Sequence, residues 1–520
     1  MKRLLLFAAV AFASISAACG GGGSTPPPPP PVGNFSNASL KGQYAYAMSG
    51  EDLNGAFIAR VGSFFADGNG NTTQALEDVN SVNGVNTVSF TGGTYAIQPN
   101  GRGTLILTNA TSSLLLSVTL ISPNKGFMIQ TDLNATSSGN FNLQSPGAFS
   151  NPGISGNYVF DVSGVDALIP AFPISMVGQI QTDGGGNVQG GTMDVNDGAA
   201  LVGPSGPLTV PKSTYAVDTS ADGTTFGRGT ITIDVKSFVF YIVDNTRFKM
   251  MEINNGATLG DATLQTGTIP TQTSAFGGNF AFLIGGSSVI GTMGPLTRAG
   301  RFFADGSGNL NTIFLDDNNF GSTHSTSPSN ISNASYTIDA THAGSGRGTL
   351  TFQDSRLADA FKFVFYLVSP TQAVIQDTSN GVIADGSMLA QAAGPLTFPT
   401  TGNFAFNWSG IILNSSNTIQ FEEDFVGQYS PGTPGANGFN GAMDFEELGS
   451  GGKNLFTNVP ITVSTSIQLD GTGPNGYRVV TGNSPSTTFN YRAYIVDQNT
   501  VFLMGFDSNQ VIAGTVVAQP

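Results

Sequence analysis

Four copies of one pattern run along the sequence and constrain its fold more than any other feature. An aromatic-rich opening, GQYAYAMSG at Gly42, returns as GNYVFDVSG at Gly156, GNFAFLIGG at Gly278 and GNFAFNWSG at Gly402. A DGxGN segment and a GRGT segment then follow in the same order in the first three copies. A period of about 120 residues that keeps several landmarks in order indicates a duplicated folding unit. The fourth copy diverges, with SPGTPGANG and NGYRVV in place of these two segments.

The hydrophobic period inside each copy is two, which predicts β-strands. In the first opening segment, Tyr44, Tyr46 and Met48 alternate with small residues. Such alternation is typical of strands with one buried face and one wet face. Gly, Asn and Asp turns divide each copy into about eight short strands, which favours an antiparallel meander. We therefore predict an all-β protein of four tandem up-and-down barrels of about eight strands each, with β-sandwiches as the alternative.

Pro- and Ser-rich segments between the copies mark the boundaries of these units. The expected organisation is a signal peptide (1–18), a lipidated cysteine with a Gly/Pro-rich tether (19–38), and four β-domains (39–144, 155–266, 277–391 and 402–520).

The N-terminus has the anatomy of an exported lipoprotein. The apolar run Leu4–Ala13 is too short to span a membrane as a helix and follows a basic start, as in a signal peptide. Cys19, the only cysteine, precedes GGGGSTPPPPPPVG, which favours an extended tether. The segment resembles the bacterial lipobox, with Ser16 where that family usually has Leu. The resemblance implies lipidation of Cys19, and Gly20 favours outer-membrane placement. Ordinary cleavage ahead of a disordered leader is the alternative.

Charge and cysteine content bear on partners and stability. The chain has 19 basic and 34 acidic side chains, for a net charge of −15. A polyanion of this kind is repelled by nucleic acid, so nucleic-acid binding is excluded as a function class. A single cysteine allows no intramolecular disulfide, so packing must provide the stability in an oxidising compartment.

The opening Gly-x-aromatic of each unit resembles the Gly-x-Trp start of lipocalin-like and avidin-like barrels, with Tyr44, Tyr158, Phe280 and Phe404 in place of Trp. In that superfamily a late arginine packs over the opening aromatic, whereas here the repeated arginine is in mid-unit. The combination of lipobox, tether and repeated units also resembles tandem-repeat exported lipoproteins of acidobacterial type. These resemblances imply small barrels on a tethered, exported chain.

The DGxGN segments are the most regular polar feature. Oxygen-bearing side chains recur within them and are candidate Ca²⁺ ligands: Asp67, Asn69 and Asn71; Asp183 and Asn187; Asp305, Ser307 and Asn309. Calcium prefers six to eight oxygens, and each loop offers one carboxylate. Asp followed by Gly between strands is also the usual hairpin turn. We therefore expect hairpin turns and no cofactor, with calcium as the alternative.

The GRGT segments place an arginine at the same point of each copy: Arg102, Arg228 and Arg347, with Arg478 in the divergent fourth copy. The segment lacks the spacing of a phosphate-binding loop and begins a strand instead of a helix. We expect a bulge or turn whose arginine stacks on aromatic rings across one barrel end.

No repeated catalytic set is present. His324 and His342, the only histidines, stand at no metal-ligand spacing and are expected in surface loops. Five acidic residues gather in the fourth copy: Glu422, Glu423, Asp424, Glu446 and Glu447. Two carboxylates across a cleft can hydrolyse glycosides, but such clusters are usually solvated hairpin faces.

Duplication, a tether and the lack of a repeated site together predict a non-enzymatic envelope or surface lipoprotein. Its repeats are expected to act as spacer or interaction modules that contact a surface protein or glycan. The alternative is a set of barrels that each hold a small apolar or sugar ligand, which requires a hollow interior. A hydrolase in the fourth copy is the second alternative.

Overall fold

The computed structural model describes residues 33–520 except 167–170, 207, 209–212, 255, 395, 397–398, 400, 415, 417, 432–437, 450–451, 465–476 and 484–487. Inside strands, the side chains of 431, 438–439, 462–464, 477–483 and 488–489 also lie outside the described part. The expected signal peptide, Cys19 and most of the tether therefore lie outside the described residues. No helix within the described part is long and apolar enough to cross a membrane.

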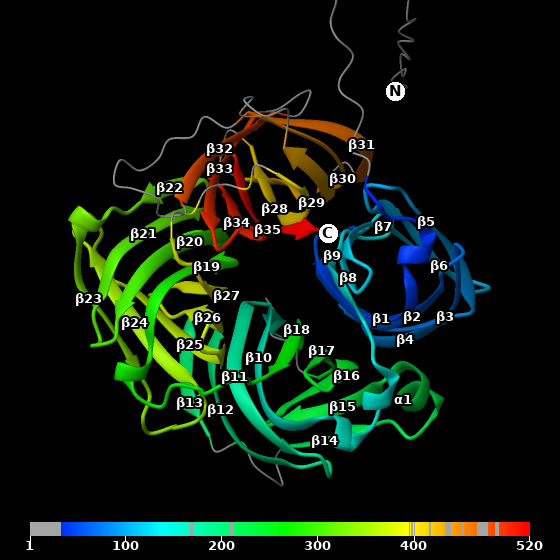
Figure 1. The fold of residues 1–520 in the computed structure, drawn as a ribbon, viewed down its shortest axis with the longest axis horizontal. Coiled ribbons are helices and arrows are strands. Elements are labelled where there is room, and N and C mark those ends of the chain that lie inside the picture. The colour runs from blue at the N-terminus through cyan, green and yellow to red at the C-terminus, as the bar shows by residue number, and fades with distance from the viewer. Residues whose placement is uncertain are drawn as a thin grey trace, which may run out of the picture.

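The chain forms four β-sheets, one for each sequence copy (Figure 1). Barrel 1 contains η1 (Asn37–Ser39), β1 (Lys41–Glu51), β2 (Phe57–Asp67), β3 (Asn71–Ser81), β4 (Gly84–Phe90), β5 (Gly92–Ile97), β6 (Arg102–Thr108), β7 (Ser113–Ser122), β8 (Lys125–Gln130) and β9 (Ser138–Leu143). Barrel 2 contains η2 (Pro146–Ala148), η3 (Asn151–Gly153), β10 (Ser155–Asp166), β11 (Pro173–Asp183), β12 (Val188–Asp197), β13 (Ala200–Ser205), β14 (Thr214–Val217), α1 (Ala221–Phe226), β15 (Arg228–Ile233), β16 (Lys236–Asp244), β17 (Arg247–Glu252) and β18 (Gly256–Leu264).

The other two copies repeat this order. Barrel 3 contains η4 (Thr273–Ala275), β19 (Gly277–Ser288), β20 (Gly294–Asp305), β21 (Leu310–Asn319), β22 (Ser322–Ser325), η5 (Pro328–Asn330), β23 (Ile331–Ile338), β24 (Arg347–Asp354), β25 (Phe361–Ser369), β26 (Gln372–Asp377) and β27 (Val382–Ala390). Barrel 4 contains β28 (Asn403–Leu413), β29 (Ile419–Pro431), β30 (Gly438–Gly449), β31 (Gly452–Ser464), β32 (Tyr477–Asn483), β33 (Thr488–Ile495), β34 (Thr500–Gly505) and β35 (Gln510–Gln519).

Each sheet is an antiparallel meander whose last strand pairs with its first. In barrel 1, β9 returns to β1, and Asn71 of β3 pairs with Thr94 of β5 on the other side. Single bridges join the equivalent strands of barrels 2 and 3, while β28 to β35 form a closed barrel. The predicted all-β fold of four antiparallel up-and-down barrels is confirmed, and the units are barrels as the resemblance implied.

The barrel interiors are filled with the side chains that the alternation predicted to be buried. In barrel 1, Tyr44, Tyr46 and Phe64 are fully buried, and the ring centroids of Tyr44 and Phe64 are 5.3 Å apart. Similar aromatic clusters fill the other barrels. One cavity of about 210 Å³ opens at an end of barrel 3 beside Arg298 and Asp317. The packed cores do not favour a ligand inside every barrel, because an eight-stranded barrel is just filled by its side chains.

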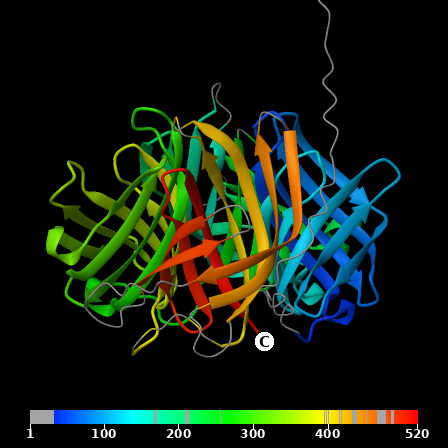
Figure 2. The same cartoon turned by 90° about the horizontal axis from the view of Figure 1, so that it is seen from above.

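The four barrels are arranged as a closed ring around a central opening (Figure 1), and the view turned by 90° shows them side by side in one layer (Figure 2). Small apolar clusters join each barrel to the next: Ala45, Ala47 and Val61 of barrel 1, for example, pack on Val239 and Met251 of barrel 2. A comparable cluster joins barrel 4 back to barrel 1. The small residues of the opening strand were expected to face water. They are buried instead, because short side chains let two sheets approach closely.

All barrels point in the same direction, so the ring has two different faces. One face, which we call the turn face, carries the DGxGN turns; the opposite loop face carries the β1–β2, β3–β4, β6–β7 and β8–β9 connections and their counterparts. Gln144 near the turn face of barrel 1 contacts Ile242 near the turn face of barrel 2. Asn80 and Gly256 make a corresponding contact near the loop face.

The two faces differ in polarity. Fifteen large apolar side chains are exposed among the described residues. All of them except Phe303 lie in loop-face connections or at the strand ends next to these connections. They are Leu53, Val82, Val85, Leu133, Phe172, Leu201, Val202, Val235, Ile290, Met293, Leu357, Ile419, Leu455 and Phe456. The first described residues lie on the turn face, where the N–H of Phe35 donates to the carbonyl of Pro99.

Candidate functional site

The repeated arginines hold neighbouring barrels together. Arg228 of barrel 2 donates from Nε and Nη2 to the carboxylate of Asp78 in barrel 1, at 2.8 and 3.0 Å. The hydroxyl of Tyr241 donates to the same carboxylate at 2.7 Å, and the Asp78 side chain is fully buried. A bidentate, charge-assisted pair of this kind fixes orientation as well as adding energy. Arg228 thus binds a carboxylate of the neighbouring barrel, whereas stacking on aromatic rings was expected.

The pairing of this arginine with an aspartate of the preceding barrel recurs at two other junctions. Arg347 and Tyr366 of barrel 3 bind Asp194 of barrel 2 at 2.7 to 2.8 Å. Where barrel 4 meets barrel 1, Arg102 donates to Asp444 at 2.5 Å.

The junction between barrels 3 and 4 uses a different arginine. Asp316 accepts a hydrogen bond from Tyr494 at 2.7 Å and pairs with Arg492 at 3.5 Å. The strand register places Tyr477 opposite Tyr494 and Arg478 opposite Ala493, so Tyr477 takes the register position of Arg228 and Arg347. The side chain of Arg478 lies outside the described residues.

An asparagine completes three of the junctions, and a glutamine contributes to all four. Asn80 donates to the carbonyls of Glu252 and Gly256, and Asn196 and Asn318 make equivalent contacts with the next barrel. A glutamine at or directly after the end of the last strand of each barrel donates to carbonyls of the following barrel: Gln144, Gln265, Gln391 and Gln519. Because Gln519 binds the carbonyl of Leu120 in barrel 1, the last contact closes the ring.

The seam between barrels 4 and 1 replaces the asparagine with an ion pair. Glu446 stands where the other copies have Asn80, Asn196 and Asn318, and its carboxylate contacts the ammonium of Lys453. Lys453 in turn donates to the carbonyl of Gln130 at 2.8 Å and to that of Ala135. These carbonyls belong to the connection that the asparagines bind elsewhere, so a lysine takes over the role of the amide.

The DGxGN segments are hairpin turns whose aspartates are occupied by the turn itself. Oδ1 of Asp67 accepts the N–H groups of Asn69 and Asn71 at 2.6 and 3.0 Å, and Oδ2 accepts the Asn71 side chain at 2.9 Å. Asp183 and Asp305 repeat this pattern. The hydrogen bonds from Asn71 and Asn69 lower the pKa of Asp67 to about 2. No group of three or more metal-ligating side chains occurs in the described part of the chain.

The acidic residues of barrel 4 do not share one cleft, because successive strand residues point to opposite sides. Glu423 and Glu447 are on the inward side of barrel 4, with the core residues Phe425 and Phe445. Glu422, Asp424 and Glu446 are on the outer side, against barrel 1. They were expected on a solvated hairpin face, but Asp424 and Glu446 are fully buried. Burial is the main reason why the pKa of Asp424 lies well above its usual range.

The two histidines lie in partly exposed positions with aspartate partners. His324 contacts Asp354 at 3.2 Å, and His342 contacts Asp339 at 2.8 Å. Asp354 also binds Arg356, and Asp339 also binds Arg347. Each histidine is thus part of a local charge network.

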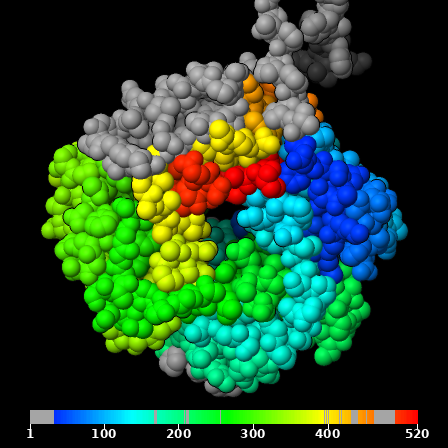
Figure 3. All heavy atoms as spheres, in the orientation of Figure 1, coloured from blue at the N-terminus to red at the C-terminus, as the bar shows by residue number. Residues whose placement is uncertain are grey.

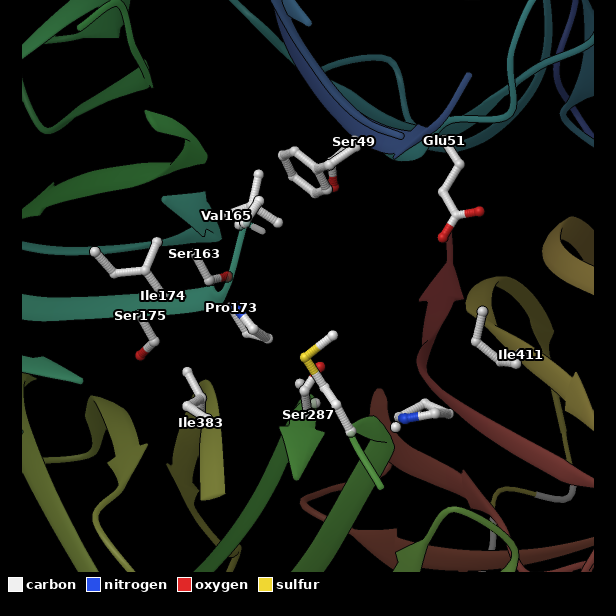
Figure 4. Close-up of a pocket in the computed structure, with 18 of the residues that line it drawn as sticks. Ser49, Glu51, Ser163, Val165, Pro173, Ile174, Ser175, Ser287, Ile383 and Ile411 are labelled. Atoms are coloured by element: carbon white, nitrogen blue, oxygen red, sulfur yellow. The ribbon is translucent and has the colours of Figure 1, made fainter. Parts of the chain in front are cut away.

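A cavity shared by all four barrels lies on the axis of the ring. Its volume is about 480 Å³, and its wall includes Ser49 and Glu51 of barrel 1, Ser163 of barrel 2, Asp385 of barrel 3 and Ile411 of barrel 4. Figure 4 shows that the carboxylate of Glu51 points into this space. The space-filling view shows a depression at the centre of the ring (Figure 3). The second half of the repeated opening segment, ending in Ser49 and Ser163, therefore lines the axis.

Both carboxyls in this wall have raised pKa values. Burial, and to a smaller extent the charge of Asp52, raises the pKa of Glu51 to about 7. Burial also raises the pKa of Asp385 to about 7, although the hydroxyls of Ser163 and Ser175 act in the opposite direction. These groups therefore titrate close to neutral pH. A second cavity of about 330 Å³ shares Ser49 with the first.

Sequence reasoning missed the junction residues and the axial cavity. A signal for the junctions was present, because LEDVN, TMDVN and FLDDN repeat an Asp-x-Asn on the third strand of each unit. The partner of each pair lies in the next repeat, so the signal within one unit does not identify the contact. Glu51 and Asp385 occur in one copy each, so comparing the copies could not find them.

No protein-family model matches the chain, and no curated protein matches it. Among solved structures, CghA with Sch210972 is 11% identical, with 96% of each chain covered and a TM-score of 0.15. A double mutant of the vaccine antigen transferrin-binding protein B from Haemophilus parasuis is 10% identical, with 76% of this chain and 83% of that chain covered and a TM-score of 0.18. Similarity at these TM-scores carries no argument about function.

Proposed function

We propose that the protein is a non-enzymatic, lipid-anchored interaction scaffold of the cell envelope, displayed as one closed ring. The observation that carries the proposal is the junction aspartate that recurs four times at equivalent positions, Asp78, Asp194, Asp316 and Asp444, and each time binds a side chain of the next barrel. A spacer of independent beads is not favoured, because barrel 4 also contacts barrel 1. The ring acts as a single platform with one partner-binding face.

The polarity of the ring supports a direction for this platform. The first described residues are on the turn face, so a lipid attached to Cys19 would join the ring there and leave the loop face pointing away from the membrane. The loop face carries the exposed apolar side chains, and exposed apolar surface is a feature of protein interaction sites. Placement in the outer membrane remains part of the proposal and rests on Gly20.

Membrane attachment is tested by labelling cells with radioactive palmitate and fractionating them. The natural chain is expected to be labelled and to sediment with membranes, whereas Cys19→Ser is expected to lose both properties. An unlabelled natural chain in the soluble fraction would contradict the anchor.

The binding face is tested with a photo-crosslinking residue at Val235 on the loop face and at the exposed Asn245 on the turn face of the same barrel. Crosslinked partners are expected from position 235 only. Equal yields from both positions, or none from either, would contradict a loop-face platform.

A further inference from the structure

The axial cavity has a wall made of strands from all four repeats. β1, β10, β19 and β28 each contribute residues, so the space exists only in the closed ring. Its volume of about 480 Å³ falls in the range of small-molecule sites. The cavity is distinct from the exposed apolar loops of the proposed platform, although Met293 and Ile419 belong to both.

The wall of the cavity is amphipathic. Its apolar part includes Phe57, Val165, Ile174, Ile383 and Ile411, which favour a hydrocarbon portion of a ligand. Its polar part consists of serine hydroxyls and the carboxyls of Glu51 and Asp385; Figure 4 shows Glu51 with Ser49, Ser163, Ser175 and Ser287. A ligand that fills the space must therefore have an apolar body and a polar end.

The charge of the wall selects the polar end. No lysine, arginine or histidine is among the residues that line this cavity. The carboxylate of Glu51 forms no hydrogen bond or ion pair with another described residue, and it points into the space (Figure 4). A primary ammonium group has three donors and a compact charge, which suits a carboxylate surrounded by hydroxyl acceptors. A metal ion does not fit, because calcium needs more oxygen ligands than two carboxyls provide.

We propose that the axial cavity binds an amphipathic organic cation, a primary amine with a short hydrocarbon body, and that Glu51 pairs with its ammonium group. The bound cation ionises Glu51, which removes the cost of leaving this carboxyl charged and unpaired. Asp385 adds negative potential in the same wall, and the hydroxyls of Ser49 and Ser163, which also line the cavity, can accept the remaining ammonium hydrogens. The hydrocarbon lies against the apolar wall.

The test is isothermal titration calorimetry of the mature ring with n-octylamine, and with n-octanol as a neutral probe of the same chain length. One molecule of n-octylamine per ring is expected to bind, with n-octanol at least about tenfold weaker, which corresponds to the loss of one charged hydrogen bond. The variant Glu51→Gln is expected to bind n-octylamine about tenfold more weakly. Asp385→Asn should weaken it to a smaller extent.

Glu51→Gln should fold, because burial already favours the neutral carboxyl. Asp359→Asn, an exposed carboxyl outside the cavity wall, is the matched control and should bind like the natural chain. Three results would each overturn the proposal: no saturable binding of n-octylamine, equal binding of n-octanol, or unchanged binding by folded Glu51→Gln. None of these results affects the lipid anchor or the loop-face platform, which the palmitate and crosslinking experiments test separately.

Discussion

Removal of one junction carboxylate should weaken the ring at a single place. Asp194→Ala deletes the acceptor for two Arg347 nitrogens, each at 2.8 Å, and for the Tyr366 hydroxyl at 2.7 Å. Breaking a buried ion pair costs about 3–5 kcal/mol, because one charge stays buried without its partner. Arg347 keeps a second contact, with Asp339 at 3.1 Å, so we take the lower part of this range, about 3 kcal/mol.

Hydrogen–deuterium exchange measures this loss where it occurs. The free energy of local opening should fall in β11 and β25, the strands that face each other at this junction, and their exchange should accelerate about 100-fold. Strands at the opposite junction, where barrel 4 meets barrel 1, should keep their protection. Asp359→Ala, a change at an exposed carboxyl of the neighbouring barrel, serves as the control.

A second variant distinguishes the loss of the ion pair itself from the cost of leaving the Arg347 charge buried without its partner. Asp194→Leu combined with Arg347→Met and Tyr366→Phe removes the three side chains of this contact, and it should recover more than half of the lost protection because Asp339, the carboxylate that remains, keeps its contacts with Thr341 and His342. Exchange in Asp194→Ala within threefold of the natural chain would refute the argument. A triple variant no better than Asp194→Ala would refute it as well.

Three other perturbations should show how the charges act. Burial raises the pKa values of Glu51 and Asp385 to about 7, so the native state binds more protons than the unfolded chain between about pH 4 and 7. The free energy of unfolding should therefore fall as pH rises through this window, by up to about 1.4 kcal/mol per unit of pKa shift. Thermal melts at pH 5 and pH 8 should show this fall and a smaller one in Glu51→Gln/Asp385→Asn; a natural chain that melts higher at pH 8 would contradict the assignment. Lys453→Met should raise exchange in β8, because it removes the donor to the carbonyls of Gln130 and Ala135 and the cation beside Glu446. Unchanged exchange would show that the lysine does not hold the seam. Calcium should leave the melting temperature of the ring unchanged, because the carboxylate oxygens of Asp67, Asp183 and Asp305 accept hydrogen bonds within their own turns. A rise in melting temperature that disappears in Asp305→Ala would instead support calcium binding at these turns.

The barrels could be predicted from the sequence because the signal for them is local. Alternation around Tyr44 and Tyr46 identified the inward side chains, and the DGxGN turns marked hairpin ends. The order of strands followed from short connections. These features depend on residues within one copy, so one sequence was sufficient to find them.

The ring could not be predicted, because its contacts join residues of different copies. Ala45 and Ala47 look like solvent-facing positions in an isolated strand, and only the neighbouring barrel makes them interior. Arg228 and Asp78 are 150 positions apart in sequence, and no feature of either segment indicates that the two residues form a pair. The axial cavity is still harder to predict from the sequence, because its shape depends on the angles between barrels at all four junctions.

The direction of the junctions limits how such a chain can change. Every junction joins the third strand of one barrel to a different surface of the next barrel, so the contact is head-to-tail. Such a contact closes into a ring only when the rotation from one barrel to the next is a whole fraction of 360°. Gain or loss of one copy by recombination would leave a gap or an overlap where Gln519 meets Leu120. Solenoid proteins lengthen and shorten freely, whereas a family built on this geometry should keep its count at four unless all the junction angles change together.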